Sequence, residues 1–192
     1  MLAFHTNLVK MGWASRDARA PSAGQQDAGA PFSEGCYNPG MALMSETNFL
    51  KTLPEVVIAH LPPALQGIEV RQPWRWLVQF HYGESRLHYE VSRVRYRGGW
   101  ELGFHCEAGD SNLNRFLLNG FRRHLFEIKD TLGEGIEAEM WDKGWTKIYE
   151  IYPAGELTKA YQGEVGRRLA QIIICLHPIY VELRGTVARS YR

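Results

Sequence analysis

The stretch WLVQFHYGESRLHYEVSRVRYRGGWELGFHC, residues 76–106, decides the fold. Apolar and polar side chains alternate along three of its segments, which are separated by glycine-containing turns: 76–82, 87–96 and 100–106. Alternation with a period of two predicts half-buried β-strands, and the short connections predict antiparallel neighbours. A four-residue loop, 83–86, pairs Phe80 with Tyr89 and so brings apolar side chains together. The stretch therefore predicts an antiparallel meander with one apolar face and one polar face.

Helical patterns and a second hairpin flank this meander. Apolar side chains recur at helical spacing in three places: 45–61, 110–133, and from Glu156 to Pro178, where a kink or an end is expected. Residues 136–141 and 145–152 alternate around an Asp-Lys-Gly turn, and 68–70 can add a short strand. The order helix, three or four strands, helix, two strands, helix predicts an α+β domain, in which helices pack on one face of a single antiparallel sheet.

Two details of strand register follow from these turns. The second hairpin sets a charge pair and an aromatic pair across its strands: Glu139 with Lys147, and Trp141 with Trp145. In the meander the apolar phase slips after Val91, which predicts a β-bulge near Ser92 or Arg93.

The first residues of the chain differ from the rest. The part 18–40 is rich in Ala, Gly, Pro, Ser and Gln and has no apolar periodicity, a composition typical of disorder. Met41 and Met44 stand directly before the first helical pattern, so this part is either a disordered leader or lies upstream of the true translation start. The expected boundaries are the leader at 1–43, one folded domain at 44–184 and a frayed tail at 185–192.

The bulk composition argues against several classes of protein. A net charge of +1 gives no long-range attraction to nucleic acid or anionic lipid, and no apolar run reaches the ~18 residues that suggest a membrane span. The three cysteines, Cys36, Cys106 and Cys175, form no CxxC pair, and an odd number is a poor disulfide framework. We therefore expect a cytoplasmic protein with reduced thiols and no membrane partner.

Three histidines of the meander, His81, His88 and His105, raise the question of a metal site. In the register above, His81 faces His88 on the polar side. Pairing about a tight glycine turn places His105 three or four residues from His88, on the order of 10 Å away. The ligand atoms of one zinc ion lie only a few ångströms apart, so this register argues against a three-histidine site. We expect exposed imidazoles on a polar sheet face, with no metal and no cofactor.

No sequence pattern of an enzyme active site stands out. A restriction-type nuclease needs an acidic residue and then Glu-x-Lys on the next strand, but Glu127-Ile128-Lys129 lies on a predicted helix. The sequence contains no Gly-rich phosphate loop and no nucleophile elbow. We therefore assign no catalytic residue, and a metal-dependent hydrolase or nuclease is the least favoured function.

A nucleic-acid surface is one candidate site. Cationic side chains lie beside tryptophan in one segment and recur at helical spacing in another, and such a combination can grip phosphate and stack on bases. The residues are Trp74, Arg75, Arg93, Arg95, Arg97, Arg115, Arg122 and Lys129. The alternative is a solvated face beside core tryptophans, which the near-neutral charge favours.

A protein-binding surface on the polar sheet face is the other candidate. It carries large aromatic and polar side chains: Trp141, Trp145, His81, His88 and Glu90, with Gln79 and Glu101. Large aromatic residues in a polar surround are typical of an interface, which could be that of a homodimer. The alternative is that the two tryptophans merely pack on each other.

The order of elements resembles the secretion-chaperone-like fold of bacterial type III secretion chaperones. This resemblance implies a dimer that binds unfolded segments of other proteins. A second resemblance lies in ELGFHCEAGDSNLNRFLLNGFRRHLFEIKDTLGEGIEAEMWDKGWTKIYEIYP, residues 101–153, about a third of the chain. It is carried by a strand ending in a carboxylate, an Asn-x-x-x-Leu helix, the helix exit at Ile128, Leu132 and Gly133, and the tryptophan-bearing hairpin.

This second segment is similar to a bacterial domain of unknown function that is often fused to restriction-nuclease-like proteins. The similarity implies a bacterial protein near a defence or DNA-processing system, and it supplies no catalytic residues. We therefore predict a small, non-enzymatic binding or adaptor module, for which a chaperone-like role is one form, with a nucleic-acid-binding accessory domain as the alternative.

Overall fold

The computed structural model describes the backbone of residues 42–190 and the side chains of residues 42–186, which belong to one compact unit. Within this range the chain forms helices and strands in the following order: α1 (Glu46–His60), β1 (Glu69–Trp74), β2 (Leu77–His81), β3 (Leu87–Val94), β4 (Gly99–Cys106), α2 (Ser111–Arg123), α3 (Leu125–Leu132), β5 (Glu137–Met140), β6 (Thr146–Pro153) and α4 (Lys159–Ser190).

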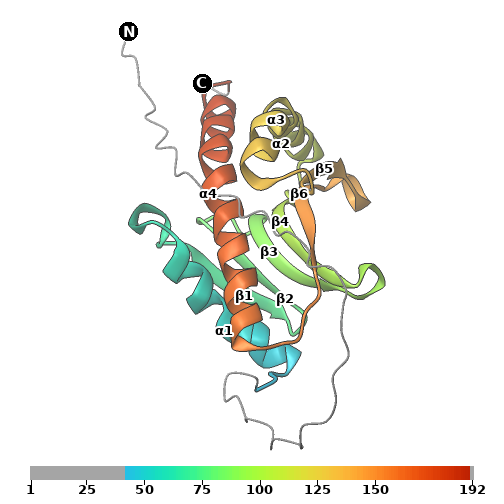
Figure 1. Ribbon diagram of the computed structural model, residues 1–192. Coiled ribbons are helices and arrows are strands. Elements are labelled where there is room, and N and C mark those ends of the chain that lie inside the picture. Colours follow the sequence, from blue (N-terminus) through green and yellow to red (C-terminus); the bar gives the residue numbers. More distant parts are fainter. Residues whose placement is uncertain (1–41, 191–192) are drawn as a thin grey trace, which may run out of the picture. The chain divides into compact units, whose positions relative to one another are not determined.

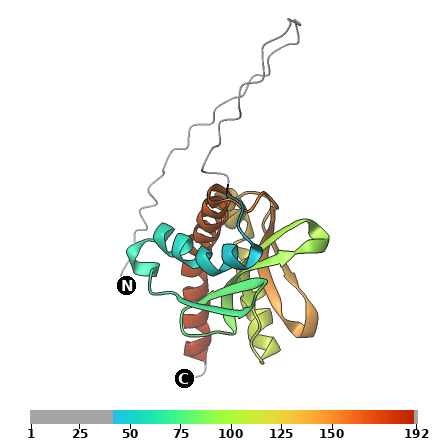
Figure 2. The same ribbon diagram turned by 90° about the horizontal axis from the view of Figure 1, so that it is seen from below.

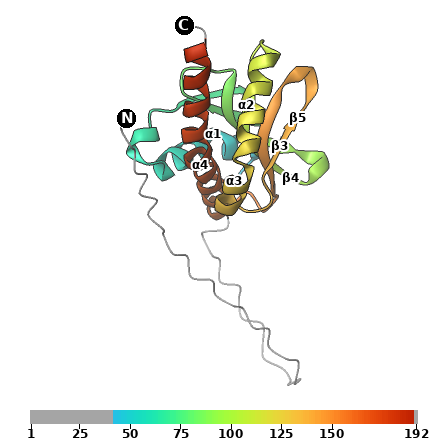
Figure 3. The ribbon, with the colours of Figure 1, turned by 90° about the horizontal axis from the view of Figure 1, so that it is seen from above.

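The strands form one six-stranded sheet in the order β1-β2-β3-β4-β6-β5, and every neighbouring pair is antiparallel. The helices lie on one side of β3 and β4 (Figure 1 and, from above, Figure 3). The predicted fold class, α+β with helices packed on one face of a single antiparallel sheet, is confirmed.

One continuous apolar core fills the space between the sheet and the helices. The strands contribute alternate side chains, among them Val78, Phe80, Tyr89, Val91, Leu102 and Phe104. The helices contribute the opposing apolar stripes, among them Phe49, Leu53, Leu117, Phe121, Val165 and Leu169. Because side chains alternate along a strand, this packing turns the remaining strand residues to the other side of the sheet, which we call the polar face.

The β2–β3 register is the predicted one: Phe80 pairs with Tyr89. The β3–β4 register differs from the prediction. A 3₁₀ turn (Arg95–Arg97) and Gly98, at φ 62°, join the strands, so that Val94 pairs with Gly99 and every later pair is displaced from the tight-turn register. The predicted bulge near Ser92 or Arg93 is wrong, because the β3–β4 pairing is continuous from Leu87 to Val94. The register shift lies instead between β1 and β2.

The helical predictions needed two corrections. The helix expected over 110–133 is two helices, because His124 leaves the helical conformation at φ −99° and ψ 8° and separates α2 from α3. The last helix does not end at Pro178 but continues to Ser190, so residues 185–190 are helical rather than a frayed tail. Pro178 has no backbone N–H to donate to the carbonyl of Ile174, four residues earlier. Ile174 is 42% exposed, so water can reach this side of the helix.

Other local predictions agree with the structure. Ser45 caps α1 by accepting a hydrogen bond from the Asn48 amide at 3.2 Å, and Pro54 does not divide the helix. The hairpin of β5 and β6 pairs Glu139 with Lys147 as expected. The two expectations for residues 1–43 concern a segment of which all but the last two residues lie outside the described part. No helix among the described residues is both long enough and apolar enough to cross a membrane.

Candidate functional site

A cleft of about 980 Å³ lies on the polar face of the sheet. Its floor comes from side chains that point away from the helices on adjacent strands: Gln79, Glu90, Ser92, Glu101, His105 and Lys147. The β3–β4 turn and the β5–β6 hairpin project away from α4, and they bound this side of the sheet (Figure 2). We refer to this space below as the cleft.

Tryptophans stand at two ends of the cleft. Trp74 and Trp76 flank the β1–β2 turn and are 62% and 44% exposed. Trp141 and Trp145 flank the β5–β6 turn, with ring centroids 5.4 Å apart. The register places the two turns at opposite ends of the strands, because Leu77 pairs with Ser92 whereas Thr146 pairs with Cys106. The aromatic pairs therefore lie diagonally across the floor.

The polar floor is buried, which overturns the expectation of exposed imidazoles. Each of the following polar side chains has an exposed fraction of 8% or less: Gln79, His81, His88, Glu90, Glu101, His105 and Lys147. Buried charges are costly unless they are paired. Lys147 Nζ lies 2.8 Å from Glu101 Oε2 and 3.9 Å from the centre of the Tyr149 ring, so this ammonium is held by a carboxylate and an aromatic face.

His105 is the most confined ionisable group of the floor. Its Nε2 lies 3.2 Å from Glu101 Oε1, and its Nδ1 lies 3.8 Å from Glu107 Oε1. Neither nitrogen has a hydrogen bond of good geometry to any described residue. Burial by itself lowers the pKa of His105, but the carboxylates of Glu101, Glu107 and Glu90 outweigh burial and raise the pKa from 6.5 to about 9. The ring is therefore an imidazolium at neutral pH, held by ion pairs.

Glu90 and His88 belong to a second set of contacts. The Gln79 amide donates to Glu90 Oε2 at 3.0 Å and lies 2.9 Å from His88 Nε2. Burial raises the pKa of Glu90, but the hydrogen bonds from His88 and Gln79 and the charge of His105 outweigh it and lower the pKa to about 2. The pKa of Glu101 is also lowered: burial opposes this shift, and His105 and Lys147 cause it. The floor thus keeps ionised carboxylates beside cations.

The predicted separation of His88 and His105 is wrong. The two residues pair directly across β3 and β4, and their ring centroids are 5.6 Å apart at an interplanar angle of 24°. The error came from the turn, which is longer than the tight glycine turn that the register prediction assumed. His81 does not join them; the third group of the cluster is Glu107, so that no three-histidine site forms among the described residues.

The predicted protein-binding residues lie in or beneath the cleft. Trp141, Trp145 and Glu90 line it, whereas His88 lies buried below and His81 lies outside the lining. The tryptophans do pack on each other, but Trp141 remains 37% exposed.

The predicted nucleic-acid residues are divided by the fold. Trp74, Arg75, Arg93 and Arg95 line the cleft at its β1–β2 end. Arg97, Arg115, Arg122 and Lys129 lie outside the lining. Of these, Arg97 donates to the Tyr149 hydroxyl, Arg122 donates to the Ala138 carbonyl, and Lys129 pairs with Glu134. The basic stripe of α2 and α3 is therefore separate from the arginines of the cleft.

Several lining residues are not part of either predicted surface, among them Glu107 and Lys147. The sequence places Lys147 in a hairpin charge pair. Glu107 follows the last residue of β4, where a period-two pattern no longer assigns a face. A carboxylate directly after a strand that carries a polar-face histidine was the available signal.

Comparisons with models of protein families, with curated proteins and with solved structures find no match. The site is therefore defined by its own geometry.

Proposed function

We propose that this chain is a non-enzymatic binding module that captures an extended segment of a partner protein in the cleft. The observation that carries the proposal is the pairing of exposed tryptophans at both ends of a buried charged floor. Large aromatic side chains in partly enclosed positions supply most of the energy of many protein interfaces, while buried charge pairs fix register and partner choice. A volume of about 980 Å³ accommodates several side chains of a peptide.

The charges of the cleft indicate the chemistry of the partner segment. On the floor, three carboxylates, those of Glu90, Glu101 and Glu107, stand against two cations, Lys147 and His105. The arginines of the lining, Arg75, Arg93 and Arg95, belong to the β1–β2 end, where Arg95 pairs with Glu46. An incoming basic side chain would balance the surplus carboxylate of the floor, and the tryptophan faces would attract it by cation–π interaction. We therefore propose a segment with a Lys or Arg over the floor and an apolar side chain at each aromatic end.

Selection of random displayed peptides against the purified full chain tests this proposal. We expect enriched sequences that share a basic residue between apolar ones. In a fluorescence-polarisation titration with a selected synthetic peptide, the variant Trp141→Ala/Trp145→Ala should bind about 30-fold more weakly or worse, because the loss of a single hot-spot aromatic residue already costs about 2 kcal/mol or more.

Phe126→Ala is the matched control for this titration. Phe126 is an aromatic residue of α3 that is 82% exposed and lies outside the cleft lining, so its removal should leave peptide affinity unchanged. Equal affinity of the wild type and the double tryptophan variant, with folding intact by circular dichroism, would refute the proposal.

A nucleic-acid ligand is the second candidate, because Trp74, Arg75, Arg93 and Arg95 line the same cleft. It predicts that a labelled single-stranded oligonucleotide binds, that its affinity falls steeply with salt, and that Arg75→Ala weakens it. The floor carboxylates repel phosphate, which is why we place this candidate second. Oligonucleotide binding that survives in the double tryptophan variant but fails in Arg75→Ala would reverse the order.

Further aspects of the proposal concern the setting of the protein. We propose a bacterial, cytoplasmic protein that acts as an adaptor or chaperone in the form of a homodimer. The free thiols of Cys106 and Cys175 among the described residues suit a reducing compartment. Light scattering after size exclusion tests the dimer.

A further inference from the structure

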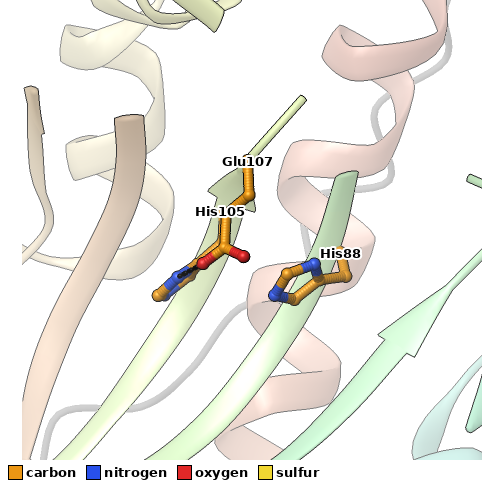
Figure 4. A group of neighbouring side chains, drawn as sticks. All are labelled: His88, His105 and Glu107. Atoms are coloured by element: carbon orange, nitrogen blue, oxygen red, sulfur yellow. Dashed lines mark ion pairs between the residues drawn. The ribbon is translucent and has the colours of Figure 1, made fainter. Parts of the chain in front are cut away.

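Beyond partner binding, we propose that His88, His105 and Glu107 form a binding site for one zinc-class divalent metal ion at the Trp141 end of the cleft floor. These residues each offer one ligand atom, and the three atoms lie within 4.8 Å of one another. Figure 4 shows the Glu107 carboxylate, just beyond the end of β4, pointing toward the two imidazole rings, which come from neighbouring strands. The name His–His–Glu cluster is used below for these three residues.

The burial of His105 is the first argument for a ligand. Its side chain is 3% exposed, and neither ring nitrogen has a hydrogen bond to a described residue. A buried polar group without a hydrogen bond is costly, and such groups in folded proteins call for a specific explanation. A metal ion would take the place of the Nδ1 proton, which is released to solvent, and so supply the missing partner; Nε2 would keep its proton beside Glu101 Oε1, 3.2 Å away, and Glu107, whose Oε1 now lies 3.8 Å from Nδ1, would bind the same ion.

The surroundings of His88 point to the same arrangement. Its Nδ1 lies 3.0 Å from the Ser85 carbonyl, so Nδ1–H donates there, and the neutral ring has its lone pair on Nε2. A metal ion at Nε2 would replace the present contact of this nitrogen with Glu90 Oε2, 3.4 Å away. Metal-binding histidines almost always donate the other ring N–H to a carbonyl or carboxylate, which fixes the ring and its tautomer. His88 already has such an outer partner in Ser85, and Glu101 Oε1, 3.2 Å from Nε2 of His105, is placed to become one for His105.

The Gln79 amide now lies 2.9 Å from His88 Nε2, and this contact would have to break before a metal ion could bind there. The amide would keep its other hydrogen bond, which it donates to Glu90 Oε2 at 3.0 Å. The ligand atoms must also draw closer: tetrahedral zinc with bonds of about 2.0–2.2 Å needs ligand atoms about 3.4 Å apart. From within 4.8 Å, the proposal requires side-chain rotation to close this difference while the backbone pairing of β3 and β4 stays as it is.

The ligand set selects the class of metal. Two imidazole nitrogens and one carboxylate oxygen suit zinc and its late first-row neighbours, whereas magnesium prefers oxygen ligands and retains its water. Glu101, which also pairs with Lys147, and Glu90 favour an added positive charge, so a bound metal ion would compete with the basic side chain that the proposed function places over the floor. His105 and Glu107 line the cleft, so a fourth coordination position would face the space where the partner segment binds.

Isothermal titration of zinc into the untagged, chelator-treated full chain tests the site. We expect one zinc ion per chain, no heat with magnesium, and visible absorption bands of low-coordinate cobalt when Co²⁺ replaces zinc. His88→Gln, His105→Gln and Glu107→Gln should each weaken binding by more than about 100-fold, because even outer-shell changes cost about 10–100-fold.

His81→Gln is the matched control. His81 is a buried histidine of the neighbouring strand β2 outside the cluster, so its variant should bind zinc as the wild type does. If the buried histidine variants do not fold, zinc binding by Glu107→Gln is the deciding measurement. Glu107 is only half-buried and lies beyond the strand end, so this variant should fold. Absence of stoichiometric zinc binding by the wild type, or binding that Glu107→Gln leaves intact, would overturn the proposal, and peptide capture would stand or fall separately.

Discussion

The two faces of the sheet bury their side chains by different physical means. On the helix side, apolar side chains such as Phe104 and Tyr89 are removed from water by packing, with ring centroids 4.8 Å apart. On the polar side, Glu101, His105 and Lys147 are nearly as buried, yet they are ionised and held by one another. The helix side is stabilised by the burial of apolar surface area, and the polar side by the pairing of opposite charges. Substitutions on the two sides should therefore differ in how much stability they cost, in the pH dependence of that cost and in their effect on function.

The largest expected effect on stability is on the helix side. Phe104→Ala removes a ring that is 1% exposed and contacts the rings of Tyr89, Phe121 and Tyr180. We expect a loss of about 3–5 kcal/mol in the free energy of unfolding, measured by urea denaturation, because a cavity adds to the lost transfer energy. Phe126→Ala, at an 82% exposed site, should change stability by no more than about 0.5 kcal/mol. Similar losses in both variants would contradict this account of the core.

The next effect concerns pairing on the polar face. Lys147→Met leaves the Glu101 carboxylate with His105 as its remaining partner, so we expect a loss of about 2–3 kcal/mol, below that of a wholly unpaired buried charge. The double variant Glu101→Gln/Lys147→Met should lose less than the single Lys147→Met variant, because the buried charge goes with its partner. A strictly additive double-mutant cycle would show that the pair does not matter.

The pH dependence of stability should separate the two faces further. The folded pKa of His105, about 9, lies above the unfolded value of 6.5. Its contribution is therefore fully present below pH 6.5 and is lost as the pH rises through 9, on the order of 3 kcal/mol in total. Unfolding free energies measured with chelator from pH 6 to pH 9.5 should fall in the wild type.

The variant His105→Gln should have a flatter alkaline limb, whereas Phe104→Ala should keep the wild-type slope at lower overall stability. The acid side has the opposite sign. The lowered pKa of Glu90, about 2, gives stability that is present above pH 4.5 and lost as the pH falls toward 2. If the unfolding free energy of His105→Gln falls with alkaline pH as steeply as that of the wild type, another group causes the pH dependence.

The smallest effect on stability is expected at the rim of the cleft. Trp141 is 37% exposed and contacts Trp145, so Trp141→Ala should cost about 1 kcal/mol, as a thermal melt would show. The same variant should nevertheless weaken capture of a selected peptide, because the exposed ring is available to a partner. A stability loss as large as that of Phe104→Ala would make Trp141 a core residue instead.

Much of the sheet could be predicted because its signals are local. The pairing of Phe80 with Tyr89 and of Glu139 with Lys147 follows from alternation and from loop length. The β3–β4 register could not be read in this way. Gly98-Gly99 suggests a tight turn, but the chain forms a 3₁₀ turn before Gly98, and this choice moves His105 opposite His88.

The parts of the candidate site could be predicted better than their assembly. Trp141, Trp145 and Glu90 were assigned to one surface and Trp74, Arg75, Arg93 and Arg95 to another, yet all seven line one cleft. Trp141 and Trp145 are far in sequence from the other five residues and meet them because the sheet order places β6 next to β4. Glu107, beyond the strand end, had no periodicity to assign its direction.

By itself, the sequence determined the order and approximate positions of most strands and helices, the apolar face of the sheet and its α+β class, since periodicity and turn chemistry act over a few residues. Tertiary structure alone decided that the polar face is buried rather than solvated, that His88 and His105 are neighbours, and that tryptophans from two distant hairpins share one cleft. The physical reason is that burial and charge pairing depend on side chains supplied by other strands, and no local pattern records which strands those will be.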